Sequence, residues 1–312
     1  MSFIKNYVEY ASEFTDSPKE FHEAMAYFCM SSILGSRCRL DIGQNGLFPV
    51  IWVALLAPSG FYRKSTALNI AQNVIMSADP LAVIGSQFNE KQVIDTLAEQ
   101  KSACTFFGEF DRLLLNRRGT LISTLIEIFD CPPFLPVGRI RSNVDVSYPF
   151  LNIAAASTNQ WFSGQIRNSD SQGGLIPRFL IIVPEDRAVK PLQEKHDADK
   201  FSKLINALTM LKLRADGSAY KYSAMAASEY SSWYASLVHK NTATGYRYDP
   251  FMVRLADYVH KIALLSFIDS GTEGLEIGPE FVKVGYRFCD AVFKRLADSE
   301  ILKAVGKSKK RS

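Results

Sequence analysis

The chain has 312 residues, of which 47% are hydrophobic and 22% are charged, and its formal net charge is +4. This length and composition are ordinary for a globular protein with a large core, arranged as about two domains or as one large domain with added helices. The small basic excess only weakly favours a polyanionic partner. The five scattered cysteines and four isolated histidines argue against a disulfide framework and a built-in zinc site, and reduced cysteines fit a cytoplasmic protein.

Membrane insertion and secretion are not indicated. The first residues, MSFIKNYVEYASEF, contain no apolar signal core, and the longest apolar run, LFPVIWVALLAP, is too short to span a bilayer. We therefore expect a cytoplasmic protein with no membrane partner.

The N-terminal third alternates between helical and strand patterns. Residues 17–37 predict a helix whose apolar face includes Phe21, Met25 and Phe28, and residues 37–43 predict a strand that ends before an Asn45–Gly46 turn. The continuous apolar run at 48–58 is typical of a strand that is buried on both faces. A loop follows it directly, and then a helix over 64–78.

This loop, APSGFYRKST, resembles the phosphate-binding pattern G-x-x-x-x-G-K-[ST]. Such a loop points backbone N–H groups and the positive end of a helix at a phosphate. Lys64 and Ser65 match the lysine and the magnesium-binding hydroxyl. The two glycines are replaced by Ala57, which is small, and by Arg63, which must adopt glycine-like backbone angles or shift the loop. The alternative is a basic surface turn that opens a helix. The residues predicted to bind nucleotide are Pro58, Ser59, Gly60, Arg63, Lys64, Ser65 and Thr66.

The middle of the chain continues the alternation of strands and helices. The predicted elements are a helix at 89–100, a strand at 102–114 that ends in acids, a helix at 120–133, a hairpin at 137–148, a strand at 149–160, a loop at 163–174 and a strand at 175–185. This order predicts an α/β fold with a largely parallel sheet and helices on both faces.

After residue 196 only helical periodicity is evident. Helices are predicted at 197–216, 223–240, 249–268 and 278–305. The expected organisation is an N-terminal helical segment (1–37), a P-loop ATPase core (38–190), a C-terminal helical lid or bundle (196–304) and a basic disordered tail (305–312).

Two acids follow the predicted strand at 102–114. An NTPase needs carboxylates at the tip of a strand beside the phosphate loop, one for magnesium and one to activate water. Glu109 and Asp111 are the candidates, and Gly108 stands where the first acid of an adjacent pair is usual. The alternative is an ordinary solvated strand end.

Two further polar residues follow in a specific order. Asn159 ends the strand AAASTN, where an amide can orient the attacking water, and Arg178 precedes the last apolar strand. An arginine in that place can stabilise the phosphoryl group on a neighbouring subunit. Considered singly, Asn159 is more simply interpreted as a turn residue and Arg178 as a surface charge.

Five segments of the chain together resemble a family of helicase-like P-loop ATPases. These segments are FHEAMAYFCMSSILGSR, VALLAPSGFYRKSTAL, FFGEFDRLL, AAASTN and GGLIPRFLIIVPE. The family is known mainly as a domain of unknown function in phages, mobile elements and primase–polymerase proteins, and is similar in layout to superfamily 3 and AAA+ replicative helicases. The resemblance covers most of residues 1–270, and a P-S-G-x-x-x-K-S-T loop is acceptable in that family.

The resemblance implies site roles. Lys64 and Ser65 would bind phosphate and magnesium, Glu109 would be the catalytic carboxylate, Asn159 the sensor and Arg178 an arginine finger that acts on a neighbouring subunit. Because Gly108 departs from the family pattern, Asp111 is the alternative magnesium ligand. The cofactors implied are ATP and Mg²⁺, and the assembly implied is a homo-oligomer such as a hexameric ring.

Three other arginines are weaker candidates. Arg254 lies on the predicted lid helix, from which it would reach the γ-phosphate or merely line the rim of a helical bundle. Arg139 and Arg141, in the predicted hairpin, would contact the phosphates of a DNA backbone with little sequence preference. Short basic pairs are also common on protein surfaces.

The leading functional hypothesis is an oligomeric ATP-driven motor on DNA, mainly single-stranded, in phage or mobile-element replication. Any primase would be a separate protein. One alternative is a nucleotide-gated loader or scaffold, including a defence scaffold, that does not unwind DNA. Another is a degenerate P-loop fold that does not hydrolyse nucleotide.

Overall fold

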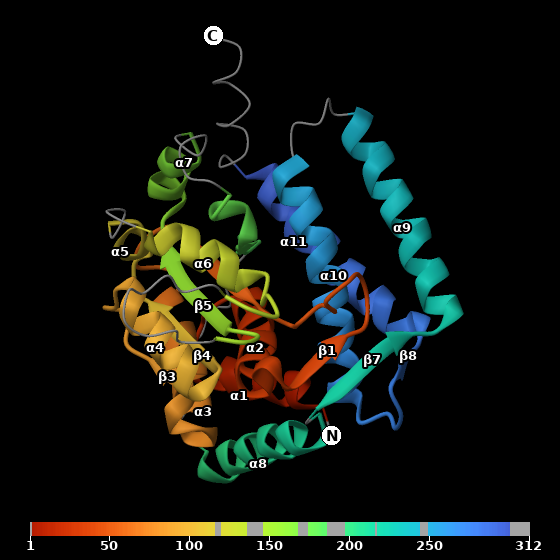
Figure 1. Ribbon diagram of the computed structural model, residues 1–312. Coiled ribbons are helices and arrows are strands. Elements are labelled where there is room, and N and C mark those ends of the chain that lie inside the picture. Colours follow the sequence, from red (N-terminus) through yellow and green to blue (C-terminus); the bar gives the residue numbers. More distant parts are fainter. Residues whose placement is uncertain are drawn as a thin grey trace, which may run out of the picture.

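The structure is a computed structural model, and it describes residues 2–115, 120–135, 146–167, 174–185, 197–215, 217–243 and 249–299. Its strands form a five-stranded sheet of order β3-β4-β5-β2-β6 and a three-stranded sheet of order β1-β7-β8 (Figure 1). The strands are β1 (Cys38–Leu40), β2 (Trp52–Leu56), β3 (Val83–Ile84), β4 (Ser102–Phe107), β5 (Phe150–Ser157), β6 (Leu180–Ile182), β7 (Ser218–Tyr222) and β8 (Glu276–Ile277).

The helices lie around these two sheets. They are α1 (Phe3–Phe14), α2 (Lys19–Leu34), α3 (Lys64–Ala78), α4 (Glu90–Gln100), α5 (Phe110–Leu115), α6 (Leu121–Phe129), α7 (Asn159–Arg167), α8 (Ala198–Arg214), α9 (Ala224–Ala243), α10 (Asp249–Ser270) and α11 (Pro279–Asp298). Short 3₁₀ turns include η1 (Gly35–Arg37) and η4 (Ile176–Arg178).

The five-stranded sheet confirms the expected parallel sheet flanked by helices. Every neighbouring pair of strands in it is parallel, and all five residues of β2 are buried, as the continuous apolar run at 48–58 predicts. In this order β5 lies between β2 and β4. The carboxyl ends of these three strands therefore meet at one edge of the sheet.

Helix α2 packs directly on this sheet, against β2, β4, β5 and β6. It is buried around most of its circumference, because α1, α3 and α8 cover its other sides. A polar link joins it to the sheet: the side-chain amide of buried Asn152 donates to the hydroxyls of Ser31 and Ser32 and accepts from the Ile51 N–H. Since every one of these groups is buried, the link fixes the position of α2 on the strands.

The C-terminal region differs from the all-helical expectation. It contributes β7 and β8, and β1 pairs in parallel with β7 instead of joining the main sheet (Figure 1). Such short strands leave too few alternating residues for a reliable pattern. One continuous apolar core runs from Phe3 to Leu296, so the core includes the N-terminal helices and the C-terminal helices.

Two local expectations near the site also need correction. Asn159 begins a helix, α7, where the pattern predicts the end of a strand followed by a loop, and Asp111 lies in the first turn of α5 instead of at a strand tip. In both places the chain turns into a helix within three residues of the strand end. Such early helices place the polar groups over the edge of the sheet instead of beyond it.

All five cysteines are reduced and buried, as their spacing predicts. Burial raises the pKa of Cys38 and Cys104 to about 12, so neither is a reactive thiolate. In the described parts of the chain, each helix is too short or too polar to cross a membrane.

Candidate active site

A cavity of about 490 Å³ opens at the carboxyl ends of β2, β4 and β5. Three separate segments line it, namely the predicted phosphate loop with the start of α3, the turn after β4, and the end of β5 with the start of α7. The lining residues are Ser59, Gly60, Arg63, Lys64, Ser65, Thr66, Gly108, Glu109, Phe110, Asp111, Ala156, Ser157, Thr158 and Trp161. Most of the residues predicted to bind nucleotide therefore share one cavity with both candidate acids.

Arg63 occupies the glycine position of the loop in a left-handed conformation, with φ 47° and ψ 36°. Gly60 also has a positive φ, of 85°. A non-glycine residue in this region costs about 1 kcal/mol, so the surrounding structure must compensate for it. The loop thus keeps the glycine-like geometry in spite of the substitution.

The segment between α1 and α2 holds this strained position. The Arg63 Nε donates to the Asp16 Oδ1 at 3.3 Å, and the Ser17 hydroxyl donates to the carbonyl of Tyr62 at 3.4 Å. Asp16 is 9% exposed. The N-terminal helices therefore anchor the loop, and Arg63 has a structural partner as well as an unusual backbone.

The stability of two variants at position 63 should report this geometry. Both Arg63→Gly and Arg63→Ala lose the half-exposed ion pair, which contributes at most about 1 kcal/mol. Only glycine relieves the left-handed strain, so Arg63→Gly should be more stable than Arg63→Ala by about 1 kcal/mol in denaturant unfolding. Equal stabilities would show that position 63 is not left-handed.

The side chain of Lys64 contacts the backbone of the loop that precedes it. Its ammonium group donates to the carbonyl oxygens of Ala57 and Pro58, at 2.7 and 3.0 Å. Partial burial lowers the pKa of Lys64. A phosphate in the cavity would offset this effect, because an anion near the ammonium favours the charged form.

Helix α3 begins at Lys64, and its first turn faces the same cavity through Ser65 and Thr66. The first N–H groups of a helix have no partners within it, and the helix dipole adds partial positive charge there. This helix start combines free backbone donors, an ammonium group and two hydroxyls. Such a combination suits a phosphate group.

Glu109 follows β4 and lies across the cavity from the loop. Its side chain is 68% exposed, and the Arg112 Nε lies 3.6 Å from its Oε2. An ion pair this exposed contributes little free energy. Glu109 can therefore release Arg112 at small cost and accept a proton or a hydrogen bond from a water molecule in the cavity.

Two buried oxygens near the cavity have no hydrogen-bond partner among the described residues, namely the Asp111 Oδ1 and the Asn159 Oδ1. Buried acceptors without partners are rare and favour a missing donor or cation. Asp111 lines the cavity, whereas Asn159 follows the lining residue Thr158. Both positions fit ligands of a water molecule or a hydrated cation.

Magnesium fits this set of donors. Among the described residues, no three His, Cys, Asp or Glu side chains are grouped to hold a metal by themselves. Mg²⁺ usually takes one or two protein ligands and completes its shell with water and substrate phosphates. Ser65 and Asp111 could supply those protein ligands.

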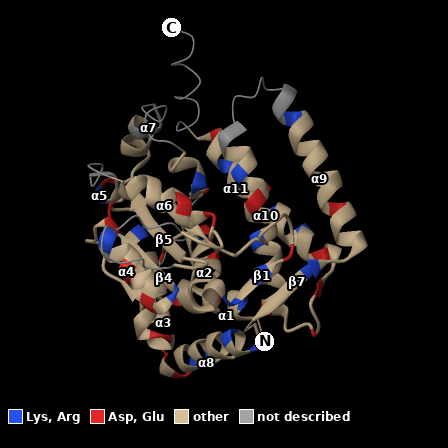
Figure 2. Ribbon diagram, in the orientation of Figure 1, with Lys and Arg blue, Asp and Glu red and all other residues tan. Residues whose placement is uncertain are grey.

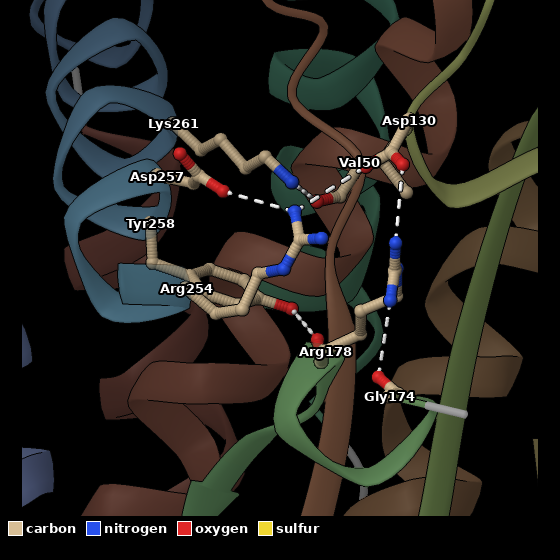
Figure 3. Close-up of polar contacts among 8 residues, drawn as sticks. All are labelled: Val50, Asp130, Gly174, Arg178, Arg254, Asp257, Tyr258 and Lys261. Atoms are coloured by element: carbon tan, nitrogen blue, oxygen red, sulfur yellow. Dashed lines mark hydrogen bonds and ion pairs between the residues drawn. The ribbon is translucent and has the colours of Figure 1, made fainter. Parts of the chain in front are cut away.

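Arg178 and Arg254 do not line this cavity; both contact Asp130 at the end of α6 (Figure 3). Arg178 donates from Nη2 to the Asp130 Oδ2 and from Nη1 to the Gly174 carbonyl, each at 3.1 Å. Arg254 donates to Asp130 at 3.4 Å and to Asp257 at 3.3 Å. The structure thus pairs the predicted finger and the predicted lid arginine with one carboxylate of their own chain.

Lys261 completes this cluster from α10. Its buried ammonium donates to the Val50 carbonyl at 2.8 Å (Figure 3). The same ammonium lies 4.0 Å from the centre of the Phe129 ring. Burial lowers the pKa of Lys261 to about 8. The cations of Arg178 and Arg254 lie within 6 Å of the same ring, at 5.6 and 5.9 Å. The cluster therefore connects α6, α10 and the turn η4 that precedes β6.

Sequence reasoning missed Asp16, Asp130, Lys261 and Trp161. The sequence contains a clue to Lys261, because this lysine interrupts the apolar face of a predicted helix. The local sequence contains no comparable clue to the other three residues. Pro58, which was predicted to bind nucleotide, contacts Lys64: its carbonyl oxygen accepts a hydrogen bond from the Lys64 ammonium group. Arg139 and Arg141 lie outside the described residues, although Leu135 and Val146 on either side of them form an antiparallel bridge.

Comparison with models of known protein families gave no match, and no curated protein matches the chain.

Proposed function

We propose that this protein is an ATP-hydrolysing, helicase-like motor that acts as an oligomer on DNA. One observation carries the nucleotide part of the proposal: Lys64, Ser65 and Glu109 line a single cavity at the carboxyl ends of the parallel strands β2, β5 and β4. The resemblance of the sequence to helicase-like P-loop ATPases supports the rest. It favours single-stranded DNA as partner, a role in phage or mobile-element replication, and the cytoplasm of a bacterial or virus-infected cell.

The proposed chemistry divides the cavity between binding and hydrolysis. The start of α3 and Lys64 hold the phosphates of ATP, with Lys64 leaving the loop carbonyls for the β- and γ-phosphates. Ser65 and Asp111 would hold magnesium, which would supply positive charge to neutralise the phosphates. Glu109 accepts the proton of the attacking water, and Asn159 orients that water.

Arg178 can act as the arginine finger only if it first gives up its contact with Asp130. To stabilise the phosphoryl group on a neighbouring subunit, it must first leave Asp130, and Arg254 would then be the remaining cation on that carboxylate. Because Asp130 is 52% exposed, water can replace the lost contact at moderate cost. Arg254 stays a second candidate for the γ-phosphate from the lid helix.

The pairing of Arg178 within its own chain also supports a second candidate function. A loader or scaffold that assembles only with nucleotide would keep Arg178 bound to Asp130 until a neighbour arrives. Such a protein would form larger particles with ATP and would not separate DNA strands. A fold that binds nucleotide without hydrolysis is the third outcome.

ATP turnover, with and without single-stranded DNA, tests the proposal. The wild-type protein should hydrolyse ATP in the presence of Mg²⁺, and Lys64→Ala should bind ATP about 10- to 100-fold more weakly because a charge-assisted contact is lost. Lys203→Ala, which changes an exposed lysine of α8, is the matched control and should behave as wild type.

The same assay separates the candidates. DNA-stimulated turnover with strand displacement supports the motor. Nucleotide-dependent growth in particle size without strand displacement supports the loader or scaffold. Equal ATP affinity in the wild type and in Lys64→Ala would refute the assignment of the site.

A further inference from the structure

A second cavity, of about 290 Å³, lies away from the candidate active site. Its lining residues are Ser36, Arg37, Cys38, Arg39, Phe48, Gln100, Lys101, Ser102, Gly217 and Ser218. Ser102 is the first residue of β4, whereas Glu109 follows the last. The two cavities therefore lie at opposite ends of the same strand, and no role proposed above uses the second one.

The charge of this second cavity is of one sign. Arg37, Arg39 and Lys101 line it, and none of the described lining residues is Asp or Glu. Within the part of the chain that the structure describes, Arg39 and Lys101 have no carboxylate partner. Figure 2 shows basic residues around β1, which carries Arg39 and is an edge strand of the small sheet. Arg39 and Lys101 come from two separate segments, and an anion between them would offset the repulsion of their charges.

The neutral polar side chains of the cavity can each donate a hydrogen bond. Among the described residues, the buried side-chain Nε2 of Gln100 has no hydrogen-bond partner, and Ser36, Ser102 and Ser218 contribute hydroxyls. A buried amide nitrogen without an acceptor is rare in folded proteins. An anion with several oxygens would satisfy both this nitrogen and the cations.

The backbone around the cavity is held in an unusual shape. Lys101 has a φ of 62°, although it is not a glycine. The N–H of Ser36 donates to the Ser102 Oγ at 3.1 Å, which ties the segment before β1 to the start of β4. Backbone strain of this kind often accompanies binding sites, since the surrounding structure must enforce it.

We propose that this cavity binds a phosphoryl group, with Arg39 and Lys101 as its main ligands and Gln100 as a neutral donor. Arginine and lysine are the side chains best suited to phosphate oxygens, and the three hydroxyls can complete the shell. The proposal does not depend on ATP hydrolysis, because it uses no residue of the first cavity.

The phosphoryl group could belong to a nucleic-acid backbone or to a small phosphorylated molecule. Tyr148 can distinguish these two sources. Its exposed ring lies 5.2 Å from the ring of Phe48, which lines the cavity. A base next to a bound backbone phosphate could stack on Tyr148, as on the aromatic side chains of single-strand binding proteins.

Two probes should be measured on a Lys64→Ala parent, so that the first cavity contributes little. The probes are pyrophosphate, followed by calorimetry, and a short fluorescein-labelled oligothymidylate, followed by anisotropy at several salt concentrations. The double variant Arg39→Gln/Lys101→Gln should bind whichever probe the parent binds about 10- to 100-fold more weakly than the parent does. For the oligothymidylate, its salt slope should fall by about 0.7 for each lost phosphate contact.

The matched control is Lys221→Gln on β7, an exposed lysine outside the cavity that pairs with Glu276. It should bind as the parent does. A thermal unfolding curve like that of the parent should show that the double variant is folded, as expected because Arg39 and Lys101 are both exposed.

Each outcome decides the proposal. Loss of oligothymidylate binding in the double variant, with weaker oligothymidylate binding in Tyr148→Ala, supports the site and identifies nucleic acid as the source. Loss of pyrophosphate binding in the double variant, with oligothymidylate binding absent or unchanged, supports the site and identifies a small phosphorylated molecule. The proposal is overturned if the parent binds neither probe, or if the folded double variant binds both as tightly as the parent.

Discussion

Replacing Glu109 by glutamine should leave ATP binding intact and reduce hydrolysis by about 10²–10⁴-fold. The amide has nearly the shape of the carboxylate, but it cannot accept the proton of the attacking water. Because Glu109 is exposed and its contact with Arg112 is weak, the substitution should not change the free energy of unfolding measurably. ATP affinity and single-turnover hydrolysis would be measured on the same preparation.

The matched control for Glu109 is Glu99→Gln, which makes the same chemical change on an exposed residue of α4. It should hydrolyse ATP at the wild-type rate. Near-normal hydrolysis by Glu109→Gln would refute its role as the base. The same measurement on Asp111→Asn would then show whether that neighbouring carboxylate, with its unpaired buried oxygen, is the base instead.

Replacing Arg178 by alanine should preserve ATP binding and reduce hydrolysis by about 10³–10⁵-fold, if this arginine acts on the phosphoryl group of a neighbouring subunit. Mixing Arg178→Ala with Lys64→Ala should partly restore turnover. In a mixed oligomer, one interface combines an intact Lys64 on one subunit with an intact Arg178 on the next. Neither variant forms such an interface by itself.

The structure makes a control for Arg178 necessary, since its side chain is 9% exposed and contacts both Asp130 and Gly174. Asp130→Asn removes the carboxylate and keeps the arginine. If Arg178 acts in catalysis, this variant should retain turnover, because the arginine is still present and less restrained. Equal losses of turnover and of thermal stability in Asp130→Asn and Arg178→Ala would show that the pair is only structural.

Two further results would contradict the ring motor. One is the absence of rescue in mixtures that demonstrably contain both variants in one oligomer; Arg178 would then act within its own chain. The other is a protein that stays monomeric in the presence of ATP and DNA, because the finger then has no neighbouring nucleotide to reach.

The sequence alone predicted the local elements around the first cavity. The strand at 48–58, the loop and the helix at 64–78 follow from one apolar run and from residues with strong local preferences, and the helix has the predicted bounds. The positions of Glu109 and Asp111 after a buried strand follow in the same way. Since parallel strands end at a common edge, these segments were expected to meet, and they line one cavity.

The tertiary structure decided what the polar residues contact. Arg63 pairs with Asp16, from the turn before α2, and Arg178 and Arg254 share Asp130, although local patterns had assigned both arginines to a nucleotide. The pairing of β1 with β7 and the second, basic cavity also join segments that are far apart in the chain. A local pattern records which face of an element is apolar. It does not record which distant charge packing brings within hydrogen-bond distance, because that depends on how whole layers of helices and strands fit together.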